Sequence, residues 1–205
     1  HTELSKEHRV VVPDMPGWGA SERPIWARDP RDIAILCNRI IEALELESVT
    51  VVGLGFGGYV AAELATMFPR RLRGMVLIGA AGLKPQNTDI LDQMLSSHRG
   101  YIEESFRDHE TYVAWMGEEP EDDMRQLWEL SREMTARVCW KPYMFNRRLE
   151  PLLADVNVPS LIIWGSEDKV MPLECAELYS KVLPNAALEV VKGAGHLVEL
   201  EEGDL

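Results

Sequence analysis

The chain has 205 residues, of which 46% are hydrophobic, and carries a formal net charge of −13. A chain of this length can form one globular domain with a sizeable core. Its negative charge repels phosphate backbones and anionic lipid surfaces, which argues against nucleic-acid and membrane-surface functions. No apolar run is long enough to span a bilayer, and no signal peptide opens the chain.

Short apolar runs alternate with amphipathic segments, a pattern typical of parallel strands joined by crossover helices. The runs expected to form strands are Arg9–Pro13, Ser48–Val52, Met75–Ile78, Ser160–Trp164 and Ala187–Val191. The segments expected to form helices are Arg31–Leu44, Gly57–Phe68 and Leu173–Val182. Asp29 before Pro30 is a favourable start for the first of these helices. The strands are apolar throughout, which predicts an α/β fold with helices on both faces of the sheet.

Residues 84–150 interrupt this alternation of strands and helices, because they are rich in charged, methionine and aromatic side chains and contain no good strand. We interpret them as a helical cap inserted between two parts of one α/β core, residues 1–83 and 151–205. Its apolar side chains either line a substrate pocket or pack the cap onto the core, and we expect packing for most of them. They are Tyr112, Trp115, Met116, Trp128, Met134, Trp140, Tyr143 and Met144. Arg137, Arg147 and Arg148 are candidate anchors for a substrate carboxylate, although a surface position is the simpler interpretation.

A glycine-rich turn follows the second predicted strand, in the sequence VVGLGFGGYV at residues 51–60. Gly53, Gly55 and Gly58 fit the spacing of a dinucleotide-binding turn. That interpretation also requires an acidic residue after the next strand, where the sequence is instead GAAG at 79–82. The other interpretation is a sharp strand-to-helix turn that holds a reactive residue at position 55, and we favour it.

Two later loops each carry one polar residue typical of acid–base catalysis. The first is WGSEDKVMP at 164–172 with Asp168, and the second is KGAGHLVEL at 192–200 with His196. Both loops follow predicted strands, as the glycine-rich turn does. Ligands of open parallel sheets bind beyond the carboxyl ends of the strands, so we expect the three loops to converge on one site.

In this order, the three loops resemble the nucleophile elbow, acid loop and histidine loop of the α/β-hydrolase superfamily. The resemblance covers essentially the whole chain and implies a mostly parallel sheet with helices on both faces and an inserted helical cap. It assigns Asp168 and His196 to a catalytic triad and the backbone N–H of Phe56 to the oxyanion hole. The segments GAAGL at 79–83 and NRRLEPLL at 146–153 are most similar to meta-cleavage-product (C–C bond) hydrolases and related esterases.

The chain departs from the family pattern in two places. Gly55 occupies the position where the family has Ser, Cys or Asp, so ordinary serine-hydrolase chemistry is not expected. The glycine is either a natural replacement or an engineered substitution that traps substrate. The resemblance also places the family's first strands, and one oxyanion-hole donor, ahead of this sequence. We therefore expect either a fragment, or a gap beside Arg9–Val12 that direct pairing or a partner chain closes.

Three functions remain open. His196 and Asp168 either form a working dyad that activates water or abstracts a proton without a covalent intermediate, or they are a relic pair retained for packing. The protein is accordingly an enzyme acting on a small hydrophobic ester or vinylogous diketone, a non-catalytic binder of such a carbonyl compound, or an interaction module. The enzyme hypothesis requires His196 Nδ1 to lie within hydrogen-bond reach of Asp168, with the other ring nitrogen facing an open cavity.

The sequence implies no cofactor and no metal, since it has neither a ligand cluster nor a phosphate loop. The expected partner is a small apolar carbonyl-containing ligand, with no nucleic acid and no membrane, and a homodimer remains open. Cys37, Cys139 and Cys175 are odd in number and widely spaced, which favours free thiols in a reducing, cytoplasmic compartment over disulfides or a zinc site.

Overall fold

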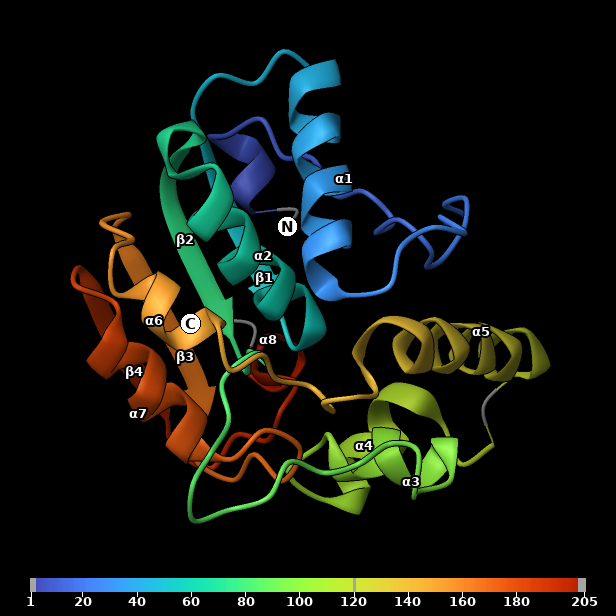
Figure 1. Ribbon diagram of the computed structural model, residues 1–205. Helices are drawn as coiled ribbons and strands as arrows, with labels where there is room; N and C mark the ends of the chain where they lie inside the picture. Colours follow the sequence, from blue (N-terminus) through green and yellow to red (C-terminus); the bar gives the residue numbers. More distant parts are fainter. Residues whose placement is uncertain (1–2, 120, 203–205) are drawn as a thin grey trace.

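The computed structural model describes residues 3–119 and 121–202. In this part of the chain, four parallel strands form one sheet in the order β1-β2-β3-β4, and helices lie on both sides of it (Figure 1). The strands are β1 (Val49–Leu54), β2 (Leu72–Ile78), β3 (Ser160–Gly165) and β4 (Ala186–Val191). An α/β fold with a parallel sheet was the prediction from sequence, and the structure confirms it.

The helices of the core lie before, between and after the strands in the chain. They are α1 (Pro30–Ala43), α2 (Phe56–Met67), α6 (Leu149–Leu153), α7 (Leu173–Val182) and α8 (Val198–Glu201), with short 3₁₀ turns η1 (Leu4–Lys6) and η2 (Pro69–Arg71). Asp29 caps α1 by accepting a hydrogen bond from the N–H of Asp32, and Pro30 takes the first helical position. Helix α2 packs on β1 and β2, while α7 packs on β3 and β4.

The prediction of a strand at Arg9–Pro13 was wrong. Residues 9–13 have no regular structure and do not join the sheet. The valine run has a high β-propensity, but a strand needs a partner, and Val12 is 68% exposed instead of packed. The sheet therefore ends at β1, with no internal gap among the described strands.

The two faces of the sheet are covered to different extents. Met75 and Leu77 of β2 are buried, as is Ile162 of β3, which pairs with Leu77. On the opposite face of the edge strand β1, Val52 and Leu54 remain 48% and 41% exposed. The core therefore lies mainly on the side where α2, α6 and α7 pack together.

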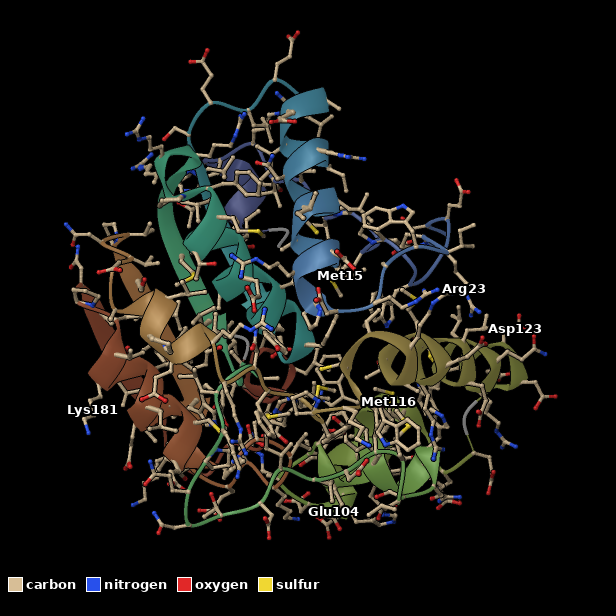
Figure 2. The ribbon with its side chains drawn as sticks, in the orientation of Figure 1. Met15, Arg23, Glu104, Met116, Asp123 and Lys181 are labelled. Carbon is tan, nitrogen blue, oxygen red and sulfur yellow. The ribbon has the colours of Figure 1, made fainter. Side chains whose placement is uncertain are left out.

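Three of the four described helices between β2 and β3 in the chain lie beyond the carboxyl ends of the strands (Figure 1). They are α3 (His98–Glu104), α4 (His109–Met116) and α5 (Asp122–Cys139). We call the chain from 84 to 150, which includes them, the helical insertion. Figure 2 shows Arg23, from the loop before α1, beside α5, where its guanidinium pairs with Glu133 at 3.0 Å. In the described residues, no helix is long and apolar enough to cross a membrane.

Candidate active site

The turn between β1 and α2 has a backbone conformation that few residues adopt. Gly55 has φ +50° and ψ −116°, a combination that side chains strongly disfavour. Its N–H donates to the carbonyl of Ile78 at 2.9 Å, and its own carbonyl accepts from Ala81 N–H at 3.0 Å. These bonds from the end of β2 hold the turn in place, so position 55 projects above the sheet at the start of α2.

The flanking glycines are required by close backbone contact. A Cβ on Gly53 would lie 2.4 Å from the carbonyl oxygen of Gly57, and one on Gly58 would lie 2.4 Å from the Cβ of Ala80. Both distances are well below contact separation, so larger residues would push α2 away from the sheet. The geometry is that of a strand-to-helix elbow, and it explains the glycine spacing without a nucleotide.

Asp168 and His196 meet as the sequence predicts. Nδ1 of His196 lies 2.8 Å from Oδ2 of Asp168. The other carboxylate oxygen of Asp168 accepts N–H groups from Val170 and Met171, each at 2.8 Å, so the carboxylate is fixed at both ends. The Asp168 side chain is fully buried, whereas His196 keeps 10% of its side-chain surface exposed. The pair is therefore rigid, with limited access to the imidazole.

The second ring nitrogen of His196 faces the elbow. A Cβ placed on Gly55 would lie 3.2 Å from Nε2, closer than to any other atom of the imidazole. The groups thus follow one another in the order of a catalytic triad: position 55, then the His196 imidazole, then the Asp168 carboxylate. Glycine leaves the first position in this order without a side chain.

Two opposing influences set the pKa of His196. Burial disfavours the charged imidazolium, while the Asp168 carboxylate and its hydrogen bond favour it, with a smaller contribution from Glu199. The favourable contributions win, and the pKa of His196 is raised above its ordinary value. A raised pKa makes the neutral imidazole a stronger base.

No cysteine replaces the absent nucleophile. The three cysteines are free, as predicted, but Cys139 and Cys175 are buried. Burial raises the pKa of both thiols to about 12, and that of Cys37 to about 11. The reactive thiolate is therefore scarce at neutral pH at all three positions.

Phe56, the predicted oxyanion-hole residue, is the first residue of α2. The N–H groups in the first turn of a helix have no carbonyl partner within the helix, so this position suits an anionic oxygen.

The Phe56 ring packs against Trp18, with ring centroids 5.0 Å apart. Gly17, beside Trp18, approaches Met134 of α5 so closely that a Cβ would lie 2.7 Å from the methionine methyl group. An aromatic and thioether wall thus flanks the elbow.

The apolar residues singled out in the helical insertion differ in burial, and three of the eight are buried. Tyr112, Met134 and Met144 are buried, whereas Trp115 and Trp140 are 54% and 61% exposed. Arg137 donates to the carbonyl of Ile25 and so ties α5 to the loop before α1. Among the described residues, no cluster of three or more His, Cys, Asp or Glu side chains could hold a metal ion.

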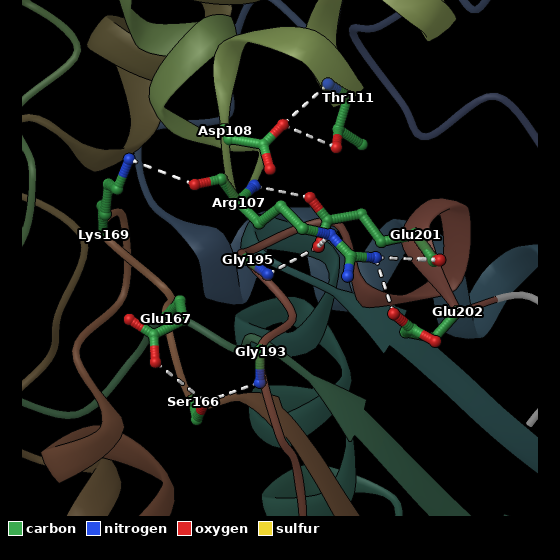
Figure 3. Close-up of polar contacts among 10 residues, drawn as sticks. All are labelled: Arg107, Asp108, Thr111, Ser166, Glu167, Lys169, Gly193, Gly195, Glu201 and Glu202. Carbon is green, nitrogen blue, oxygen red and sulfur yellow. Dashed lines mark hydrogen bonds and ion pairs between the residues drawn. The ribbon is translucent and has the colours of Figure 1, made fainter.

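Sequence reasoning did not identify the contacts that hold the histidine loop. The carbonyl of Ser105 accepts N–H groups from His196 at 2.9 Å and Leu197 at 3.2 Å. Figure 3 shows the Glu201 carboxylate between the N–H groups of Gly195 and Arg107. Glu201 belongs to the acidic run ELEE, which by itself resembles a solvated helix end, so no sequence signal separated it from its neighbours.

Comparison with known proteins identifies the family of this chain. A profile described as "Alpha/beta hydrolase family" matches residues 1–205. The chain belongs to the alpha/beta hydrolase family. Among curated relatives in this family, a 2-hydroxy-6-oxo-2,4-heptadienoate hydrolase of Pseudomonas putida is 31% identical, covering 98% of this chain and 76% of the relative. A 2-hydroxymuconate semialdehyde hydrolase of a Pseudomonas species is 30% identical, covering 97% of this chain and 74% of the relative.

Solved structures of the family have the same fold. A meta-cleavage product hydrolase from Pseudomonas fluorescens superposes with a TM-score of 0.78 at 25% identity, covering 99% of this chain and 78% of that one. A 2-hydroxy-6-oxo-6-phenylhexa-2,4-dienoate hydrolase from a Rhodococcus species gives a TM-score of 0.74 at 22% identity, covering 99% and 78%. The resemblance to meta-cleavage-product hydrolases is therefore confirmed.

Proposed function

We propose that the chain hydrolyses a small hydrophobic carbonyl compound, an ester or a vinylogous diketone, using the His196–Asp168 dyad to activate water in place of a serine nucleophile. One observation carries the proposal: Nε2 of His196 faces position 55 at 3.2 Å from a Cβ placed there, and that residue is glycine. The space that a nucleophile's side chain takes in a triad is thus open to a water molecule beside the base. The curated relative named as a 2-hydroxy-6-oxo-2,4-heptadienoate hydrolase supports the substrate class.

The chemistry balances with water as the co-reactant. His196 Nε2 takes a proton from a water molecule, and the water oxygen attacks the substrate carbonyl carbon. The resulting oxyanion faces the N–H of Phe56, whose position at the start of α2 suits negative charge. The tetrahedral intermediate then collapses with cleavage of the C–C or C–O bond, and the imidazolium returns the proton to the leaving group. Asp168 holds the imidazole in the required tautomer throughout.

The test compares the unaltered chain with the variants His196→Ala, Gly55→Ser and Gly55→Ser/His196→Ala. The substrates are p-nitrophenyl acetate and a 2-hydroxy-6-oxo-dienoate. We expect slow turnover by the unaltered chain that falls at least about tenfold in His196→Ala. We also expect faster turnover in Gly55→Ser that again requires His196, since the serine hydroxyl would lie beside Nε2.

Equal rates for the unaltered chain and His196→Ala, with both folded, would contradict the proposal. If a dienoate bound to the unaltered chain without turnover while Gly55→Ser gained His196-dependent activity, the protein would be a ligand-binding module with an intact elbow. If Gly55→Ser also stayed inert, the site would be remodelled beyond the nucleophile.

A further inference from the structure

The Glu201 carboxylate is completely enclosed, with 0% of its side chain exposed, although Glu201 ends the short helix α8. One of its oxygens accepts the N–H of Gly195 at 2.6 Å, and the other accepts the N–H of Arg107 at 2.6 Å. The Arg107 guanidinium supplies a positive charge 3.4 Å away. Burying a carboxylate costs several kcal/mol unless hydrogen bonds and an opposite charge offset it, and this one has both.

The two N–H donors belong to parts of the chain that are 88 residues apart, since 195 − 107 = 88. Gly195 directly precedes His196, and Arg107 lies in the helical insertion between α3 and α4. Glu201 therefore joins the histidine loop to the insertion through a single side chain (Figure 3).

The neighbouring contacts converge on the same short stretch of the insertion. The carbonyl of Ser105 accepts the N–H of His196 itself. Lys169, the residue after Asp168, reaches the Arg107 carbonyl at 3.5 Å and the Glu104 carboxylate at 3.5 Å. Both loops of the dyad are thus attached to residues 104–107, and Glu201 makes the shortest of these attachments.

We propose that Glu201 is a positioning residue that fixes the backbone of the histidine loop against the helical insertion and thereby sets where His196 Nε2 points. The inference rests on the proposed role of His196 as the base. A misplacement of about 1 Å at a reacting group costs up to about 100-fold in rate, so the position of this loop decides how well the dyad functions. Glu201 does not touch the reacting atoms and acts only through Gly195 and the loop.

Two acceptor oxygens are required in this position, and this makes the carboxylate irreplaceable. Glutamine has the same shape but only one acceptor, so its NH₂ group would face the N–H of either Gly195 or Arg107. Two facing donors cannot bond, and one buried N–H would lose its partner. Glu201→Gln therefore releases one end of the connection while keeping the volume of the side chain.

The matched control is the next residue along the chain. Glu202 also pairs with Arg107, with its carboxylate 2.6 Å from Nη2, but its side chain is 34% exposed. Among the described residues, its carboxylate forms no hydrogen bond or ion pair with residues 193–197. Glu202→Gln removes the same charge one residue away and leaves the connection to Gly195 in place. The groups whose charges act on His196 are Asp168 and Glu199, and neither is altered in these variants.

The primary measurement is the pKa of His196, obtained by NMR titration of its ring protons, with far-UV circular dichroism to check folding. In Glu201→Gln we expect this pKa to fall by about half a unit or more, because a displaced ring loses part of its interaction with Asp168. In Glu202→Gln we expect the pKa of His196 to stay at its value in the unaltered chain. The turnover of Gly55→Ser should fall about tenfold or more when Glu201→Gln is added, with the loss in kcat and not in KM.

A second measurement needs neither a variant nor activity. In the unaltered chain, the Gly195 and Arg107 amides should exchange with solvent as slowly as amides of the core strands. Fast exchange of the Gly195 amide would overturn the proposal, and so would a folded Glu201→Gln variant with an unchanged His196 pKa. Because neither result depends on turnover, failure of this inference is distinct from failure of the proposed hydrolysis.

Discussion

The elbow at Gly53–Gly58 and the loop of His196 form two halves of one site, and different parts of the molecule hold each of them. The elbow is held by its own backbone, through contacts between Gly53 and Gly57 and hydrogen bonds from the end of β2. The histidine loop is held by side chains and carbonyls that come from distant segments, among them Asp168, Glu201 and Ser105.

This difference separates the shape of a catalytic site from its chemistry. The elbow keeps its sharp turn although position 55 has no reactive group, because its conformation depends on glycine contacts and not on the side chain of residue 55. The histidine loop has both a His–Asp pair and the contacts that support it, since His196 and Asp168 lie 2.8 Å apart. This loop thus presents an imidazole paired with a carboxylate, whereas the elbow presents only backbone at position 55.

The largest expected effect comes from removing the negative charge of Asp168, the partner of His196. Asp168→Asn should lower the turnover of the unaltered chain or of Gly55→Ser by roughly 1,000-fold or more, because the amide no longer holds the active imidazole tautomer. The carboxylate raises the pKa of His196, so the substitution should also lower that pKa, as burial is then opposed only by the smaller contribution of Glu199. A profile of kcat/KM against pH checks both expectations.

The sign of the pH dependence follows from the raised pKa. As a base, His196 acts in its neutral form, so kcat/KM should rise with pH through a value above the ordinary pKa of about 6.5. The stability that the charged pair contributes is fully present below about pH 6.5 and is lost as the pH rises through the folded-state pKa. An Asp168→Asn profile that coincides with that of the parent would show that the pair is a relic.

A smaller effect is expected for glycine substitutions in the elbow, and it should appear in the free energy of unfolding. Gly53→Ala would bring a Cβ within 2.4 Å of the Gly57 carbonyl oxygen, so we expect a loss of about 3 kcal/mol in the free energy of unfolding. Gly57→Ala is the control, because a Cβ there has no neighbouring atom within 4 Å. As a helical glycine, Gly57 should instead gain about 0.5 kcal/mol on this change. Urea unfolding distinguishes the two, and equal losses would refute the contact argument.

The smallest effect concerns contacts within the helical insertion. The Tyr143 hydroxyl accepts the N–H of Gln93 at 2.9 Å and donates to the carbonyl of Leu91 at 3.1 Å. Tyr143→Phe leaves both groups unpaired and should cost about 1–2 kcal/mol. The Tyr112 hydroxyl is buried and has no hydrogen-bond partner within the described residues, so Tyr112→Phe should cost nothing. Thermal unfolding of both variants provides the comparison, which fails if Tyr112→Phe proves the more destabilising.

Prediction from sequence succeeded where the signal was local. The elbow glycines, the Asp29 cap and the strands β2 and β3 follow from short stretches whose geometry their own residues impose. It failed at Arg9–Pro13, where valines with a strong β-propensity have no neighbouring strand, because a strand depends on its partner. It also missed Glu201, since burial of an acidic residue depends on which distant N–H groups surround it.

By itself, the sequence determined the four strands β1 to β4 in their order, the helices α1, α2 and α7, the glycine-rich turn at position 55, and the loops that carry Asp168 and His196. These depend on residue types and on spacings along one segment. Only the tertiary structure decided that His196 Nε2 faces position 55, that the sheet ends at β1, and that the insertion at residues 104–107 supports the histidine loop. Those features arise from contacts between segments far apart in the chain, and their formation depends on how the whole core packs.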